Sequence, residues 1–213
     1  QHRHVTAEPG ERADCGRDCR VNDEEDEFDA AMPPADWARQ ILTFWFEEHG
    51  DSDWFGGGSE FDAKITERFA GWRDALRSRP VEAFLAHVDT ALAAIILFDQ
   101  VPRNAFRGTS EAFATDHIAL GIAKAAVEND LDAGLTKDQK LFLYLPFEHS
   151  EDLHDQRESV RLMSSLGDQR LLQFALAHQA MIERFGRFPH RHRALGRADR
   201  EGEAAAVAEG GSW

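Results

Sequence analysis

The sequence IILFDQVPRNAFRGT occupies residues 95–109, and the rest of the chain is organised around it. It starts as the end of an apolar helix and becomes a turn rich in charged and amide groups. Counting back from Asp99 at helical spacing gives Ile96, Leu92 and Val88, so Asp99 lies on the apolar face. We predict that it lies near the helix C-terminus, where the helix dipole disfavours an anion. Such a carboxylate needs partners, and candidates follow closely: Arg103, Asn104 and Arg107.

Composition excludes several classes of protein. The 213 residues carry a formal net charge of −15, which argues against binding to nucleic acid or to anionic membranes. No apolar run reaches the roughly 18 residues of a transmembrane helix. Residues 1–20 contain no apolar signal segment, and the two cysteines, Cys15 and Cys19, do not form a disulfide framework. A cytoplasmic location is therefore predicted.

The chain divides into three parts. Residues 1–35 contain 4 Arg and 10 Asp or Glu with few aliphatic residues, which predicts a disordered acidic tail. Its potential zinc ligands match no standard finger spacing: His2, His4, Cys15 and Cys19. Residues 36–197 form the predicted folded domain. Residues 198–213 are predicted to be a weak helix and tail.

The folded part shows helical periodicity throughout and no convincing strand alternation. The prediction is an all-α fold of antiparallel helical hairpins joined by short loops. We expect a loop at residues 51–58 and a long helix starting at Pro80. A further helix over 110–129 is expected to carry His117 on its apolar face, and Pro146 is expected to bend or end a short helix. The expected caps and stops are Asp36, Thr136, Ser150 or Asp152, and Gly186.

Charged stretches interrupt the apolar helices at their ends, and we predict that these ends meet in space. The arginines offer planar donors: Arg103, Arg107, Arg184, Arg187 and Arg191. The carboxylates offer acceptors: Asp99, Asp116, Glu151 and Asp152. One interpretation is a buried salt-bridge and capping network. The other is a pocket for an anionic ligand. One point supports the pocket: buried ion pairs stabilise inefficiently compared with apolar packing.

Two histidines are candidate bases. His178 lies on an apolar stripe with Leu171 and Ile182, which is compatible with a core histidine or with a general base. His149 lies in a crowded polar segment, residues 148–156, which also offers oxygen and nitrogen ligands for a metal. That segment has no HExxH-type pair, so we predict no metal and no cofactor. No serine or cysteine lies in the setting of a catalytic nucleophile.

Four separated segments resemble sequence motifs of the bacterial DUF924 family, and they occur in the same order along the chain as in that family. They are residues 44–46 (FWF) with 54–55 (WF), 98–108 (FDQVPRNAFRG), 144–152 (YLPFEHSED) and 184–191 (RFGRFPHR). The resemblance covers about residues 36–197 and implies an all-α fold similar to tetratricopeptide repeats, with no established activity. The family's signature residues carry over to these positions: Asp99, Gln100, Pro102, Arg103, Asn104, Arg107, His149, Ser150, Glu151, Asp152, Gln156, His178, Arg184, Gly186, Arg187, Pro189, His190 and Arg191.

This chain differs from the family pattern at two positions. A methionine is usual where Glu148 stands, and an asparagine is usual where His192 stands. The first difference adds a charge beside His149, and the second removes an amide. Either change is expected to alter a pocket, so the resemblance does not imply one ligand for the whole family.

Three functional hypotheses follow. In the first, a polar pocket binds a protein partner or a small anionic ligand, with Asp99 and Glu151 orienting the arginines. In the second, a hydrolase or lyase uses His149 or His178 as its base, with Asp99 or Glu151 as the orienting carboxylate. In the third, the module is purely structural. The enzyme hypothesis requires a histidine–carboxylate pair beside a cavity. The binding module requires exposed arginines without such a pair. The structural module requires that the arginines are fully paired within the protein and that no cavity adjoins them. Oligomeric state is not predicted. The ligand-site candidates are Arg103, Asn104, Arg107, Asp152, Arg184, Arg187, His190 and Arg191.

Overall fold

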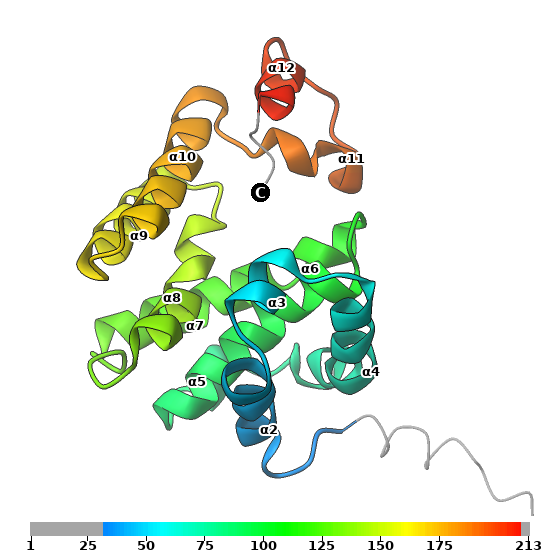
Figure 1. Ribbon diagram of the computed structural model, residues 1–213, viewed down its shortest axis with the longest axis vertical. Helices are drawn as coiled ribbons and strands as arrows, with labels where there is room; N and C mark the ends of the chain where they lie inside the picture. The colour runs from blue at the N-terminus through cyan, green and yellow to red at the C-terminus, as the bar shows by residue number, and fades with distance from the viewer. Residues whose placement is uncertain (1–31, 210–213) are drawn as a thin grey trace, which may run out of the picture. The chain divides into compact units, whose positions relative to one another are not determined.

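The computed structural model describes residues 32–209, and this part of the chain is all-helical, as predicted, without a strand (Figure 1). The predicted N-terminal tail, with its histidines and cysteines, lies outside the described residues, apart from its last four positions. The α-helices are α2 (Trp37–Thr43), α3 (Asp51–Gly56), α4 (Ser59–Leu76), α5 (Val88–Ile95), α6 (Val101–Ala105), α7 (Asp116–Glu128), α8 (Lys137–Glu148), α9 (Leu153–Ser165), α10 (Gln169–Phe185), α11 (His192–Leu195) and α12 (Glu203–Ala208). The π- and 3₁₀-helical segments are η1 (Phe44–Glu48), η2 (Val81–Phe84), η3 (Ile96–Gln100), η4 (Ser110–Phe113) and η5 (Pro189–Arg191).

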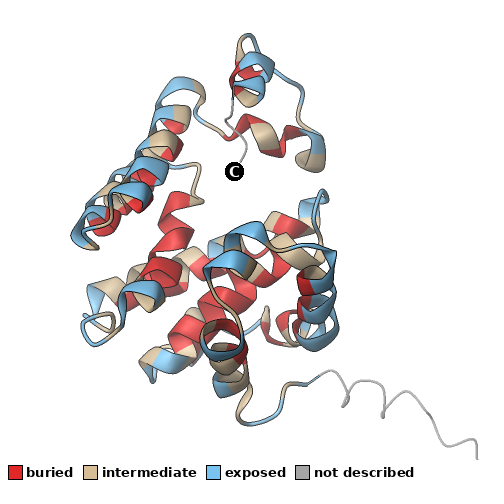
Figure 2. Ribbon diagram, viewed as in Figure 1, coloured by how far each residue is buried: buried red, intermediate tan, exposed pale blue. Residues whose placement is uncertain are grey.

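The core lies around α5 and the segment that follows it. Every residue from Ala91 to Asp99 is fully buried (Figure 2). Helices α2 and α7 pack against α5, and α4 packs against α6. Further along the chain, α8 packs against α9 and α9 against α10. The first half of the stretch at residues 95–109 therefore lies in the core, as its apolar stripe predicts, whereas residues 107–109 are exposed.

The position of Asp99 differs from the prediction. It does not lie at a helix C-terminus, because α5, η3 and α6 follow one another without a break from Val88 to Ala105. Pro102 lies in the first turn of α6 and has no backbone N–H to donate, and the carbonyl oxygen of Phe98, four residues earlier, accepts a hydrogen bond from Oγ1 of Thr115 at 2.6 Å instead. The π-helical turn η3 contains Asp99, and single π-turns are frequent at functional sites.

The predicted caps are confirmed at three helix ends. Thr136 forms a capping box with Gln139 at the start of α8. The carboxylate of Asp152 accepts hydrogen bonds from backbone N–H groups of His154 and Asp155 at the start of α9. Gly186 ends α10 in the left-handed conformation, with φ of +68°.

Other local predictions were wrong. Residues 51–56 of the expected loop form α3, because its aromatic pair packs on Phe142. The expected long helix from Pro80 is divided into η2 and α5, and the helix expected over 110–129 into η4 and α7. His117 is exposed. Pro146 lies within the last turn of α8 without ending the helix there, and Asp36 makes no capping hydrogen bond.

The C-terminal residues beyond 197 take part in the packing. Helix α12 lies against η5, and Glu203 at its start is fully buried. The carboxylate of Glu203 accepts hydrogen bonds from Nε and Nη2 of Arg187 at 2.8 and 2.7 Å. Within residues 32–209, no helix has the length and apolar character needed to cross a bilayer. The similarity to tetratricopeptide repeats stays a prediction.

Helix α3 is joined to α4 by a glycine whose replacement tests how closely the two helices pack. A Cβ atom at Gly57 would collide with the carbonyl oxygen of Asp53 and lie 2.8 Å from Cδ1 of Phe61. Gly57→Ala is expected to lower the free energy of unfolding by about 1–3 kcal/mol, the usual range for overpacking. Gly56→Ala is the matched control because nothing lies within 4 Å of its added Cβ. Equal urea unfolding midpoints for the two variants would contradict this packing.

Candidate functional site

A pocket of about 440 Å³ lies among α3, α6, α8 and α10 and the segment at residues 190–191. Seven of the residues nominated from the sequence line it: Arg103, Asn104, Arg107, His149, His178, His190 and Arg191. Asp99 lies fully buried and reaches the pocket through its contacts with Arg103 and His149. The structure thus brings eight of the twelve nominated residues into one neighbourhood.

The other four nominated residues lie outside the pocket lining. The carboxylate of Glu151 accepts hydrogen bonds from Nη1 of Arg197 at 2.8 and 2.9 Å, and from the backbone N–H of Phe188 at 2.8 Å. It therefore orients neither histidine, contrary to its proposed role. Asp152 caps α9, and the guanidinium of Arg184 lies 4.6 Å from the ring of Phe185. Arg187 is held by Glu203 at the C-terminal segment.

Asp99 and His149 form a carboxylate–imidazole pair. Oδ1 of Asp99 lies 2.8 Å from Nδ1 of His149 and 3.1 Å from Nη1 of Arg103. Burial alone would raise the pKa of Asp99, but the charge of Arg103 and the imidazole of His149 outweigh it and hold this pKa well below its usual value. The ionised carboxylate places the imidazole proton on Nδ1. Nε2 is then an acceptor, and it has no hydrogen-bond partner within residues 32–209.

His149 is neutral at pH 7. Its burial and the nearby charge of Arg103 lower its pKa, and they outweigh the opposing effect of Asp99. A neutral imidazole that is held through Nδ1 and free at Nε2 has the tautomer of a general base. The arrangement therefore satisfies the geometric requirement set above for the enzyme hypothesis.

Asp116 joins two arginines beside this pair. Its carboxylate accepts hydrogen bonds from Nη1 and Nη2 of Arg103 at 2.8 and 2.9 Å, and Nη1 of Arg191 lies 3.4 Å away. Arg191 also donates from Nη2 to the carbonyl oxygen of His149 at 2.9 Å, and its guanidinium stacks on Phe113 and Phe188. Burial and the charge of Arg103 lower the pKa of Arg191 to about 10, so it stays charged at pH 7.

Glu148 lines the pocket, as the departure from the family's usual methionine suggested, although it was not among the nominated site residues. It is only 4% exposed, and its Oε1 lies 3.3 Å from Nδ1 of His178. That nitrogen also lies 2.9 Å from the carbonyl oxygen of Phe174, which only accepts, so Nδ1 carries the proton. Burial and the charge of Asp99 raise the pKa of Glu148 to about 8, while burial lowers that of His178 to about 3. The two side chains are therefore neutral at pH 7.

A sequence signal for Glu148 does exist. It follows Leu141 and Leu145 at seven and three residues, which is the spacing of one helix face. Both leucines line the pocket together with Glu148. This face is hard to recognise in the sequence, because α8 is buried on nearly all sides from Leu141 onward and carries apolar residues on every face.

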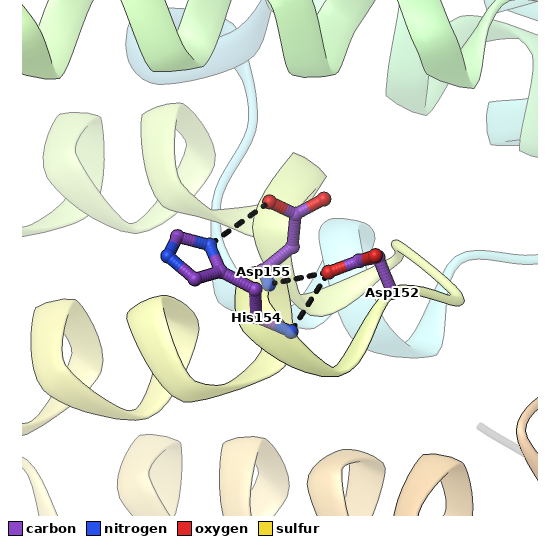
Figure 3. A group of neighbouring side chains, drawn as sticks. All are labelled: Asp152, His154 and Asp155. Carbon is purple, nitrogen blue, oxygen red and sulfur yellow. Dashed lines mark hydrogen bonds and ion pairs between the residues drawn. The ribbon is translucent and has the colours of Figure 1, made fainter.

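Among residues 32–209, two groups of side chains have ligand atoms close enough for a metal ion. The first, drawn in Figure 3, consists of Asp152, His154 and Asp155. Its carboxylates already have partners: Asp152 caps α9, and Asp155 forms an ion pair with Nζ of Lys124 at 2.6 Å and accepts a hydrogen bond from Oγ of Ser150 at 2.8 Å. The second group consists of His192, Asp199 and Glu203, where Arg187 neutralises Glu203. Both groups are thus explained as ion-pair and capping clusters.

These features define a helical protein whose pocket is built over a buried network of carboxylates, arginines and histidines. The chain belongs to the DUF924 family, described as bacterial proteins of unknown function, which it matches over residues 41–211. A solved structure of a protein of unknown function from Agrobacterium tumefaciens is similar to it, with 36% sequence identity and a TM-score of 0.76. That match covers 81% of this chain and 97% of the other. No curated protein matches the chain.

Proposed function

We propose that this protein binds a small molecule with an anionic group in the pocket among α3, α6, α8 and α10. Arg107 carries this proposal. Its side chain is 63% exposed and lines the pocket, and Asp62 and Asn104 engage only its Nε and Nη2 atoms among the described residues. The Nη1 group is thus available to an incoming carboxylate or phosphate.

The surroundings of Arg107 support the same interpretation. Arg103 and Arg191 line the same pocket, and Glu148 beside them is a neutral acid at pH 7 that does not repel an anion. The structural hypothesis requires fully paired arginines and no cavity, but a cavity adjoins three of them. The protein-partner alternative has no such support, because a pocket of this size is typical of small-molecule sites.

Titration calorimetry with propanoate and with inorganic phosphate tests this proposal. Wild type is expected to bind at least one of the two anions. Arg107→Gln is expected to weaken binding by about tenfold or more, because it removes a charge-assisted hydrogen bond. Arg103 is a poor choice of variant because it also holds Asp99 and Asp116 in the fold.

Arg77→Gln is the matched control, since Arg77 pairs with Asp74 and Glu111 and does not line the pocket. It is expected to bind as wild type does. An unchanged affinity in Arg107→Gln would overturn the assignment of Arg107. No binding of either anion to wild type would count against the proposal as a whole.

The Asp99–His149 pair does not fit a binding module as defined above, which has exposed arginines without such a pair. It favours a second candidate function at the same pocket, which is acid–base catalysis by a hydrolase or lyase. His149→Gln is expected to slow hydrolysis of p-nitrophenyl acetate by about 10²–10⁴-fold, the usual contribution of a positioned general base. His154→Gln serves as the control, because His154 is exposed and lies outside the pocket. Equal rates of p-nitrophenol release from wild type and His149→Gln would exclude this role for the substrate tested.

A further inference from the structure

The pocket has two chemically different parts. One part carries donors and charge, with Arg103, Asn104 and Arg107 on or just after α6 and Arg191 on η5. The other part is mainly apolar, and its apolar side chains come from α3, α8 and α10: Trp54, Phe55, Leu141, Leu145, Leu171 and Phe174. Its two charged lining residues are paired within the protein, Asp53 with His49 and Arg170 with Asp51. A ligand that fills the whole space therefore needs both a polar group and an apolar body.

Two rings of the apolar part are incompletely covered by the protein. Phe55 is 54% exposed and Phe174 is 46% exposed, and both line the pocket. Contact between a phenyl ring and water is unfavourable in proportion to the exposed area of the ring. An apolar group that covers these two rings removes that area from water, so the rings favour a ligand with a hydrophobic body.

The helix that carries Phe55 is anchored by contacts with its neighbours. Nε1 of Trp54 donates to the carbonyl oxygen of Trp45 at 2.9 Å, and Nη2 of Arg170 lies 3.3 Å from Asp51. The ring of Phe55 stacks on Phe142 with 6.5 Å between ring centroids. These contacts prearrange the apolar part, which limits the entropy that a ligand loses on binding.

The charges around the polar part set the charge of the ligand. The three guanidinium groups of Arg103, Arg107 and Arg191 face three carboxylates, those of Asp62, Asp99 and Asp116. Positive charge is therefore not in excess, which disfavours a doubly charged phosphate. The free Nη1 group of Arg107 suits a single carboxylate.

From these two parts we infer that the ligand is an amphipathic carboxylic acid, with its carboxylate at Arg107 and an aromatic or acyl body over Phe55 and Phe174. This inference rests on the proposed anion site and specifies what fills the rest of the pocket.

Three matched probes test the inference by titration calorimetry: 3-phenylpropanoate, propanoate and 3-phenylpropan-1-ol. The first has both parts, the second lacks the ring and the third lacks the charge. We expect 3-phenylpropanoate to bind at least about tenfold more tightly than either of the other two, since a buried phenyl ring and a charge-assisted hydrogen bond each contribute more than that factor.

Variants at the two parts separate their contributions. Phe174→Ala is expected to weaken 3-phenylpropanoate binding by about fivefold to tenfold and to leave propanoate binding unchanged. Leu176→Ala is the control, because Leu176 is 40% exposed on the same helix but does not line the pocket. Arg107→Gln is expected to weaken binding of both acids.

The outcomes distinguish this inference from the proposed function. Equal binding of propanoate and 3-phenylpropanoate, both dependent on Arg107, would overturn the amphipathic ligand and retain the anion site. Tighter binding of phosphate than of 3-phenylpropanoate would do the same. Binding of 3-phenylpropan-1-ol as tight as that of the acid would overturn both, and so would a failure of all the probes to bind.

Discussion

Replacing Asp99 with alanine is expected to lower the free energy of unfolding by about 3–5 kcal/mol, the usual cost of removing one partner from a buried ion pair. Asp99 is fully buried and contacts three donors: Nη1 of Arg103, Nδ1 of His149 and Nε2 of Gln100. Its loss leaves Nδ1 of His149 and Nε2 of Gln100 desolvated without this acceptor, whereas Arg103 keeps its bonds to Asp116. Urea unfolding followed by tryptophan fluorescence measures the change.

Two further variants make this result specific. Asp99→Asn keeps the size of the side chain and is expected to lose less stability than Asp99→Ala, because an amide oxygen still accepts a hydrogen bond. Glu60→Ala removes an exposed partner of Lys64 on α4 and is expected to change stability by less than about 1 kcal/mol. A loss below about 1 kcal/mol for Asp99→Ala would mean that water reaches this network, in contradiction to its burial.

The second large effect is a pH dependence that originates at Glu148. The folded protein raises the pKa of this carboxyl from 4.5 to about 8, because burial and the charge of Asp99 disfavour its ionised form. Between these two values the folded state holds a proton that the unfolded state has released. Stability therefore falls as pH rises through this window, by up to about 1.4 kcal/mol per pH unit.

Subtracting the unfolding curves of Glu148→Gln from those of wild type isolates this effect. Wild type is expected to lose stability relative to the variant between about pH 4.5 and 8, by several kcal/mol in total, and the difference is expected to be constant outside that window. The subtraction is needed because burial also lowers the pKa of His178 and His190. Their contributions to the free energy of unfolding therefore increase with pH, over a more acidic range than that of Glu148. Glu128→Gln, at the exposed end of α7, controls for the change from carboxylate to amide. A difference that is independent of pH, or that grows with pH, would refute the assignment.

The Glu148 equilibrium also affects the proposed ligand site. Above about pH 8 the ionised carboxylate places a negative charge beside His149 and Arg191 in the pocket lining. Affinity for an anionic ligand is therefore expected to decrease above this pH in wild type but not in Glu148→Gln.

Local sequence patterns were sufficient to predict the fold class and several helix ends. Helical spacing of apolar residues predicted an all-helical chain, and the capping chemistry located the starts of α8 and α9 and the end of α10. The patterns failed where tertiary contacts override local signals. Helix α3 forms in a glycine-rich stretch because Trp54 and Phe55 pack on Phe142, and helix α8 continues past Pro146.

By itself, the sequence determined the helical class, the central position of residues 95–109 and the candidate residue types of the site, since these depend on spacing and chemistry along the chain. Only the tertiary structure decided which groups pair. His149 meets Asp99 across 50 positions and Arg191 meets Asp116 across 75, while Glu151 binds Arg197 and Phe188 instead of a histidine. The sequence shows which carboxylates, arginines and histidines are able to pair, but any of several pairings is compatible with it. The distances between the side chains select the actual pairs, and these distances are set by how the helices pack.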